Sequence, residues 1–94
     1  MLALAASAYV ATRWYKLSHY GAWLSTVADG DNIETVHRKM GIPDRTQKRP
    51  EPIWCSVKSC EFEFLYGHSL PPEWWAVGFD GNARVVWTAK LDSP

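Results

Sequence analysis

The chain has 94 residues and a mass of 10.7 kDa, which is enough for one domain built around a single core. Ten Lys and Arg balance ten Asp and Glu, so the formal net charge is zero and the sequence isoelectric point is about 6.8. This balance argues against electrostatic binding of nucleic acid or an anionic membrane through the net charge of the whole molecule, but it allows a local charged patch. Hydrophobic residues make up 47% of the chain and charged residues 21%, which excludes a disordered chain.

Residues 1–28 are predicted to form an N-terminal apolar helix, because no Pro or Gly interrupts them before Gly21. The segment carries no charge through Thr12, and then Arg13, Lys16 and His19 interleave with four aromatic residues. An apolar stretch followed by such a belt is typical of a helix that leaves a membrane. Twelve residues rise only about 18 Å, whereas a hydrocarbon core is about 30 Å thick, so the segment as written does not span.

Three interpretations of residues 1–28 stay open: the remnant of a longer membrane anchor, an interfacial helix, and a docking helix that packs on the domain or on another protein. A cleaved signal peptide is disfavoured, because no basic region precedes the apolar residues. Gly21 also leaves open whether the segment forms one helix or two.

A second, short helix is predicted over residues 32–40. Asp31 is placed to act as its N-cap, and Glu34 stands three residues later, as in a capping box. Gly41 fits the left-handed position after the last turn, and Pro43 prevents continuation of the helix.

From residue 53 the hydrophobic periodicity changes to two, which indicates strands. Phe62, Phe64 and Tyr66 share one face of the clearest strand, and two glutamates alternate with them. The predicted strands are 53–55, 61–66, 74–79 and 84–91, and residues 42–52 and 67–72 are predicted loops. The expected fold class is α+β, with an N-terminal helix, a short capped helix and then a three- or four-stranded antiparallel meander packed on the helices, and residues 29–94 form the α+β domain.

Cys55 and Cys60 are the only cysteines, and a hairpin between them would place their sulfurs opposite each other. Closing so short a loop stabilises the fold by about 2 kcal/mol on the entropic model. A disulfide implies an oxidising compartment such as a periplasm, whereas two reduced thiols would fit the cytosol. A zinc site would need two more ligands, and His68 is the one nearby candidate, so no metal or cofactor is expected.

The candidate partner-binding residues are one tryptophan and three cations. In the predicted third strand, Trp74 points to the face opposite Trp75, so it is either exposed, as an anchor for a partner, or covered by the N-terminal helix, which is the favoured interpretation. Arg45, Lys48 and Arg49 give the loop of residues 42–52 a basic character that would suit an anionic partner, although a solvated loop is the favoured interpretation. No nucleic-acid-binding motif is present.

No residues in the chain form a recognisable catalytic signature. Glu61 and Glu63 lie about 7 Å apart on one strand face and could in principle serve as an acid/base pair, but on an alternating strand they are expected to face solvent. A hydrolase-like enzyme that uses Glu61, Glu63 or His68 is therefore kept only as an alternative, and a small-molecule ligand is not expected.

Two segments resemble small envelope proteins of the SmpA/OmlA (BamE) type. Residues 31–44, DNIETVHRKMGIPD, are similar to that family's capped helix followed by Gly-x-Pro, and Trp54 together with residues 79–86, FDGNARVV, is similar to its tryptophan strand and hairpin. The beta-lactamase-inhibitor-protein fold shares the same plan of two helices and an antiparallel sheet. The resemblance implies a fold and an envelope location, and a role in protein binding rather than catalysis. Val36, Gly41, Pro43 and Phe79 correspond as structural positions only, and no cysteine precedes position 55 to carry the lipid of the lipoprotein members.

Together these observations lead to the hypothesis of a non-enzymatic, envelope-associated protein that acts through contact with another protein. The alternative is an inhibitor or anti-effector module that uses the basic loop and an exposed Trp74. The expected location is the bacterial periplasm or a membrane surface reached through residues 1–28. A cytoplasmic location is the alternative, because cations after an apolar segment tend to stay on the cytoplasmic side.

Overall fold

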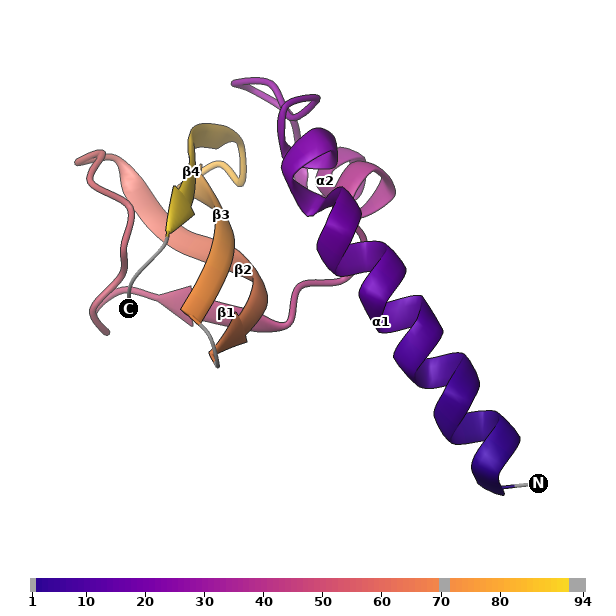
Figure 1. Ribbon diagram of the computed structural model, residues 1–94. Coiled ribbons are helices and arrows are strands. Elements are labelled where there is room, and N and C mark those ends of the chain that lie inside the picture. Colours follow the sequence, from indigo (N-terminus) through magenta and orange to yellow (C-terminus); the bar gives the residue numbers. More distant parts are fainter. Residues whose placement is uncertain (1, 70–71, 92–94) are drawn as a thin grey trace.

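The computed structural model describes residues 2–69 and 72–91, and for residues 2–10 and 69 it describes the backbone alone. Two helices precede four strands, and the strands form one antiparallel sheet in the order β1-β2-β3-β4 (Figure 1). The predicted α+β class and meander are therefore confirmed. The elements are α1 (Leu2–Leu24), α2 (Ile33–Met40), β1 (Arg45–Lys48), β2 (Cys60–Ser69), β3 (Pro72–Asp80) and β4 (Val85–Leu91).

Helix α1 is continuous through Gly21, so the question of one helix or two is answered in favour of one. Its C-terminal half packs on the sheet through Leu17, Tyr20 and Leu24, which recur at the spacing of one helical face. Its N-terminal half extends well beyond the sheet and α2, which gives the molecule its long axis of 47 Å against 25 and 21 Å (Figure 1).

Helix α2 is capped one residue later than the sequence predicts. The N-cap is Asn32, whose side-chain oxygen accepts a hydrogen bond from the backbone N–H of Thr35 at 2.8 Å. Asp31 instead accepts from the backbone N–H of Ala28 at 2.9 Å, which closes the preceding turn. The predicted C-terminal end is confirmed, because Gly41 ends the helix with a positive φ of 87°.

The core lies between the helices and one face of the sheet. The alternating rings of β2 and the predicted inward residues of β3 all reach it, so the assignment of strand faces is confirmed. In register, Phe64 pairs with Val77 and Tyr66 with Trp75. The buried members of this core are Tyr20, Val36, Met40, Phe64, Tyr66, Trp75, Val77, Phe79 and Val85.

Two strand predictions are wrong, and both errors concern the segment before β2. Residues 53–55 form a loop, and the first strand is instead β1, which lies inside the predicted loop 42–52. β1 is polar because it is an edge strand with one neighbour: it pairs Arg45 with Leu65 and Lys48 with Phe62, so backbone hydrogen bonds rather than buried side chains hold it. β2 and β3 are also longer than predicted, because β2 continues through residues 67–69 and β3 already begins at Pro72.

Candidate interaction surfaces

The loop of residues 49–59 covers the face of the sheet that points away from the helices, called here the outer face. This face carries the residues that alternate with the core rings, including Glu63 on β2 and Gly78 on β3, which are direct partners in the register. The loop therefore occupies a surface that an amphipathic sheet would otherwise leave in water.

A buried carboxylate holds this loop in place. Glu63 has no exposed surface, and its Oε1 accepts hydrogen bonds from the backbone N–H groups of Trp54 and Cys55, both at 2.9 Å. Its Oε2 also accepts from the Trp54 N–H at 3.0 Å. The expectation that Glu63 faces solvent is wrong, because these backbone donors replace the water that a buried carboxylate would lose. Glu61 is exposed, as expected.

The Cys55–Cys60 disulfide that the spacing suggests is present and closes the same loop, although Cys55 lies in irregular structure and not in a hairpin strand. Both sulfurs lie against Gly78: a Cβ added there would come within 2.6 Å of the Sγ of Cys60 and 2.8 Å of the Sγ of Cys55. A glycine at this position thus makes room for the disulfide on the outer face.

Trp54 is the large aromatic side chain that this loop exposes to solvent. Its backbone is tied to Glu63, whereas 43% of the residue is exposed. It borders an open cavity of about 250 Å³ together with Gln47, Pro52 and Ile53, between the loop and β1. An exposed indole on a rigid backbone next to an apolar cavity has the anatomy of a protein-binding anchor.

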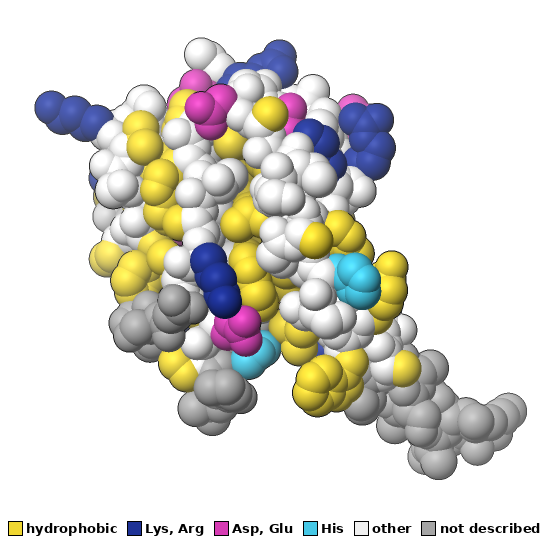
Figure 2. Space-filling view, turned by 45° about the horizontal axis from the view of Figure 1, so that its top comes forward, with side chains coloured by type: hydrophobic (Ala, Val, Ile, Leu, Met, Phe, Trp, Pro, Cys, Tyr) yellow, Lys and Arg dark blue, Asp and Glu magenta, His cyan; other side chains and the backbone are white. Residues whose placement is uncertain are grey.

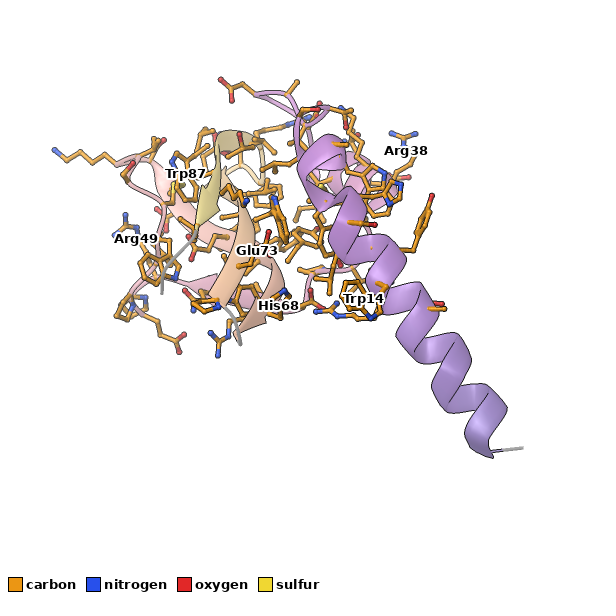
Figure 3. All side chains as sticks on the ribbon, in the orientation of Figure 1. Trp14, Arg38, Arg49, His68, Glu73 and Trp87 are labelled. Carbon is orange, nitrogen blue, oxygen red and sulfur yellow. A yellow bond between two sulfur atoms is a disulfide. The ribbon has the colours of Figure 1, made fainter. Side chains whose placement is uncertain are left out.

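The four candidate residues from the sequence do not form one surface. Trp74 lies on the outer face, so the N-terminal helix does not cover it; the Arg45 guanidinium lies over its ring instead, 5.8 Å from the centroid. Arg45 and Lys48 are three residues apart on β1 and so project to opposite faces. Arg49 donates from Nε to the carbonyl of Cys60 at 2.7 Å, beside the disulfide loop (Figure 3). Binding of a partner by these four residues stays a prediction.

A second cluster joins α1 to the sheet. Asp44 accepts from Arg13 Nη1 at 2.9 Å and from the backbone N–H of Gly67 at 2.9 Å, and its own N–H donates to the Leu65 carbonyl at 2.9 Å. Arg13 also donates from Nη2 to the Gly67 carbonyl at 2.5 Å. Gly67 has φ of 145°, and a Cβ there would collide with the backbone carbonyl of Glu73, so this junction requires glycine.

Two tyrosines lie behind this junction. Tyr66 donates from its hydroxyl to the Gly41 carbonyl at 3.0 Å, and its ring centroid is 5.4 Å from that of Tyr20. Burial raises the pKa of Tyr66 strongly, and the neighbouring Tyr20 and Asp44 raise it further. Burial also raises the pKa of Tyr20, followed by the effect of Asp44.

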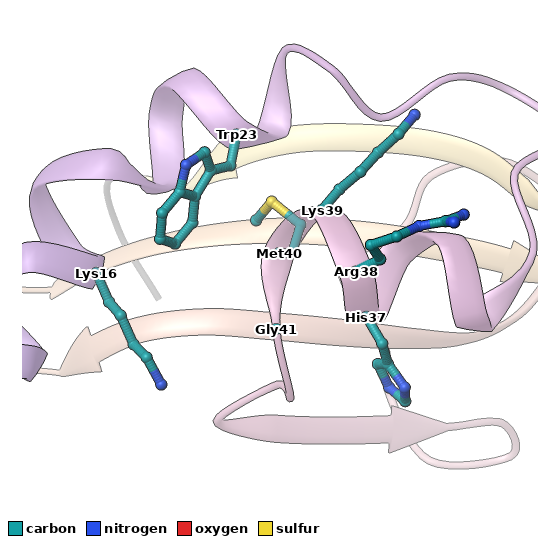
Figure 4. A pocket seen from close by; sticks show the side chains of 7 residues that line it. All are labelled: Lys16, Trp23, His37, Arg38, Lys39, Met40 and Gly41. Carbon is teal, nitrogen blue, oxygen red and sulfur yellow. The ribbon is translucent and has the colours of Figure 1, made fainter.

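An open cavity of about 340 Å³ is lined by residues of both α1 and α2 and has a basic lining (Figure 4). Lys16 and His37 extend to the same side, and the Trp23 ring lies above them (Figure 4). Lys39 turns away and pairs with Asp31 at 2.7 Å; this pairing, after the hydrogen bond from Ala28, lowers the pKa of Asp31. The remaining lining residues are Arg38, Met40 and Gly41.

The residues considered for catalysis lie apart. The Glu63 carboxylate is enclosed by the disulfide loop, whereas His68 lies five residues further along β2, where its Nε2 is 3.7 Å from Glu73 (Figure 3). Within residues 2–69 and 72–91, no three His, Cys, Asp or Glu side chains are grouped so that they could hold a metal ion.

Sequence reasoning missed Glu63, Asp44 and Tyr20, whose roles come from contacts between distant segments. Arg13 and Asp44, for example, are 31 residues apart. Trp54 was missed as an exposed ring as well, because residues 53–55 were predicted to form a strand and not a loop.

No family model matches this chain, and no curated protein matches it. A crystal structure of the osmotically inducible lipoprotein OsmE is similar to it, with a TM-score of 0.56 over 83% of this chain and 84% of that one, at 22% sequence identity. The chain has an OsmE/SmpA/BamE-like fold. The OsmE-like fold agrees with what the family resemblance implies about architecture, and at this identity the likeness concerns the fold alone.

Proposed function

We propose that this chain is a non-enzymatic, envelope-associated protein that works by binding another protein through the surface around Trp54. The observation that carries the proposal is that the 49–59 loop is held in place twice. The buried Glu63 carboxylate accepts hydrogen bonds from its backbone, and the Cys55–Cys60 disulfide closes it. A loop held from both sides loses little conformational freedom on binding, so an indole on it can anchor a partner at low entropic cost.

Two observations support the envelope part of the proposal. The disulfide fits an oxidising compartment, and the OsmE-like fold is that of a lipoprotein. The non-enzymatic part rests on the use of Glu63 as a loop support and on the position of His68, which lies five residues further along β2 on the opposite face of the strand. These two candidate residues of the alternative hydrolase therefore do not share one site. No helix within the described residues is both long and apolar enough to cross a bilayer.

The experiment is site-specific photo-crosslinking in the native host, with a photoreactive residue at position 54 and, as the matched control, at Asn82, an exposed residue in the turn between β3 and β4. We expect a discrete crosslinked product from position 54 and none from position 82. The same product from both positions, or no product from position 54, would contradict the proposal. A crosslink from position 45 or 48 alone would favour the inhibitor module instead.

The compartment is tested separately by mass spectrometry of non-reduced, alkylated protein recovered from the native host. A mass without alkylation at Cys55 and Cys60 is expected, because the two sulfurs are joined. Two alkylated thiols would argue against the envelope.

A further inference from the structure

The N-terminal half of α1 has no other described element beside it. It leaves the domain at the level of Trp14 and extends away from both the sheet and α2 (Figures 1 and 3). In residues 2–12 the only hydroxyl residues are Ser7, Tyr9 and Thr12, and none is charged. A helix that is apolar all round is stable when it is surrounded by protein or lipid.

Aromatic side chains mark the level at which this apolar segment ends. Trp14 is 70% exposed and Tyr15 58% exposed, although both are large rings on a helix that has a buried face available. Tyr15, His19 and Trp23 form a continuous ladder, with ring centroids 4.1 Å apart for the first pair and 5.6 Å for the second. Figure 2 shows hydrophobic side chains exposed along the described part of α1, beside a histidine. Rings of this kind concentrate at the headgroup level of membranes.

The charge on α1 itself has one sign, and the carboxylate that contacts it, Asp44, is paired with Arg13 at 2.9 Å. Residues 1–28 contain no Asp or Glu, whereas Lys16 is exposed just after the two rings. Lys16 also lines the cavity between the helices, to which α2 adds His37 and Arg38 (Figure 4). Cations directly behind an aromatic belt are complementary to lipid phosphates.

We infer that α1 inserts residues 2–12 into one leaflet of an anionic lipid bilayer, with Trp14 and Tyr15 at headgroup level and Lys16 beside the phosphates. Eleven residues rise about 16 Å, which matches half of a hydrocarbon core of about 30 Å. This inference goes beyond the proposed function and is independent of it, because the Trp54 loop lies on the outer face and α1 covers the opposite face of the sheet.

The test is co-sedimentation of the full chain with vesicles of phosphatidylcholine alone and of phosphatidylcholine mixed with phosphatidylglycerol. We expect binding to the mixed vesicles, and about tenfold weaker binding for the double variant Trp14→Ser/Tyr15→Ser, because two exposed rings no longer enter the interface. Lys16→Ala should weaken binding to the anionic vesicles about fivefold and leave neutral vesicles unaffected. Trp54→Ser, which removes an exposed ring on the opposite face, is the matched control and should bind as the unaltered chain does.

Ala11→Asp provides a second variant, because Ala11 is exposed and an aspartate there should not disturb the fold. Circular dichroism checks that each variant is folded. The inference is overturned if the unaltered chain binds neither kind of vesicle, or if both Trp14→Ser/Tyr15→Ser and Ala11→Asp bind as tightly as the unaltered chain. Sedimentation of the free protein as a dimer that depends on Trp14, without vesicle binding, would also overturn it and would identify a second copy as the occupant.

Discussion

Glu63 illustrates at the scale of one residue why a strand pattern can mislead. Its alternation with Phe62 and Phe64 correctly places it on the opposite face of β2 from the core. The same alternation predicts exposure, yet Glu63 is completely buried, because the 49–59 loop folds over it. The periodicity of a strand defines its faces, whereas the cover on each face depends on distant segments.

We predict that Glu63→Gln destabilises the protein by about 1–3 kcal/mol, since an amide presents donors as well as an acceptor to the N–H groups of Trp54 and Cys55. The free energy of unfolding from urea titration measures this. Glu61→Gln is the matched control on an exposed position of the same strand and should stay within about 0.5 kcal/mol. Equal effects of the two changes would mean that the buried carboxylate does not support the loop.

At the scale of elements, strand β1 and the 49–59 loop are where local sequence is least informative. Arg45–Lys48 contains no apolar residue and forms a strand only because the edge of β2 offers backbone partners. Residues 53–55 have the composition of a strand, yet the backbone N–H groups of Trp54 and Cys55 donate to the Glu63 side chain instead of to a neighbouring strand. In contrast, α2 and the longer strands carry their own caps and periodicity, and these were predicted to within a few residues.

The loop gives the second prediction. Reduction of Cys55–Cys60 should lower the free energy of unfolding by about 2 kcal/mol, because only four residues lie between the cysteines. It should also speed trypsin cleavage after Lys58, which is exposed on a loop that the disulfide no longer holds. Urea titration and timed proteolysis, with and without reductant, measure the two effects. The double variant Cys55→Ser/Cys60→Ser is the control and should match the reduced protein without responding to reductant. Unchanged proteolysis after reduction would show that Glu63 alone fixes the loop.

At the scale of the whole molecule, α1, α2 and the sheet meet at Tyr66. Its ring packs on Tyr20 of α1, and its hydroxyl donates to the Gly41 carbonyl at the end of α2. Burial, reinforced by Tyr20 and Asp44, raises the pKa of Tyr66 above its ordinary value, so the folded state retains this proton at pH values where the unfolded chain releases it.

The stabilisation from this proton is therefore complete below about pH 10 and is lost as the pH rises above that value towards the pKa of the folded state. We predict that the free energy of unfolding of the native chain falls between about pH 10 and 11, and that Tyr66→Phe, although less stable at neutral pH for lack of the bond to Gly41, shows a shallower fall. Urea titrations at pH values between about 10 and 11 measure the free energy of unfolding of each protein. Tyr15→Phe, on an exposed ring, is the control and should follow the native slope. Parallel slopes for Tyr66→Phe and the native chain would refute the linkage.

Local sequence was enough to predict the two helices, the succession of β2, β3 and β4 and the residues that face the core, because caps, glycines and a period of two act over a few neighbouring residues. It also showed that residues 1–12 are largely apolar and carry no charged side chain. Three features became evident only from the folded chain: Glu63 is buried, Arg45 rather than α1 lies over Trp74, and Asp44 links α1 to β2. These features depend on contacts between segments that are far apart in the chain, for which local pattern carries no signal.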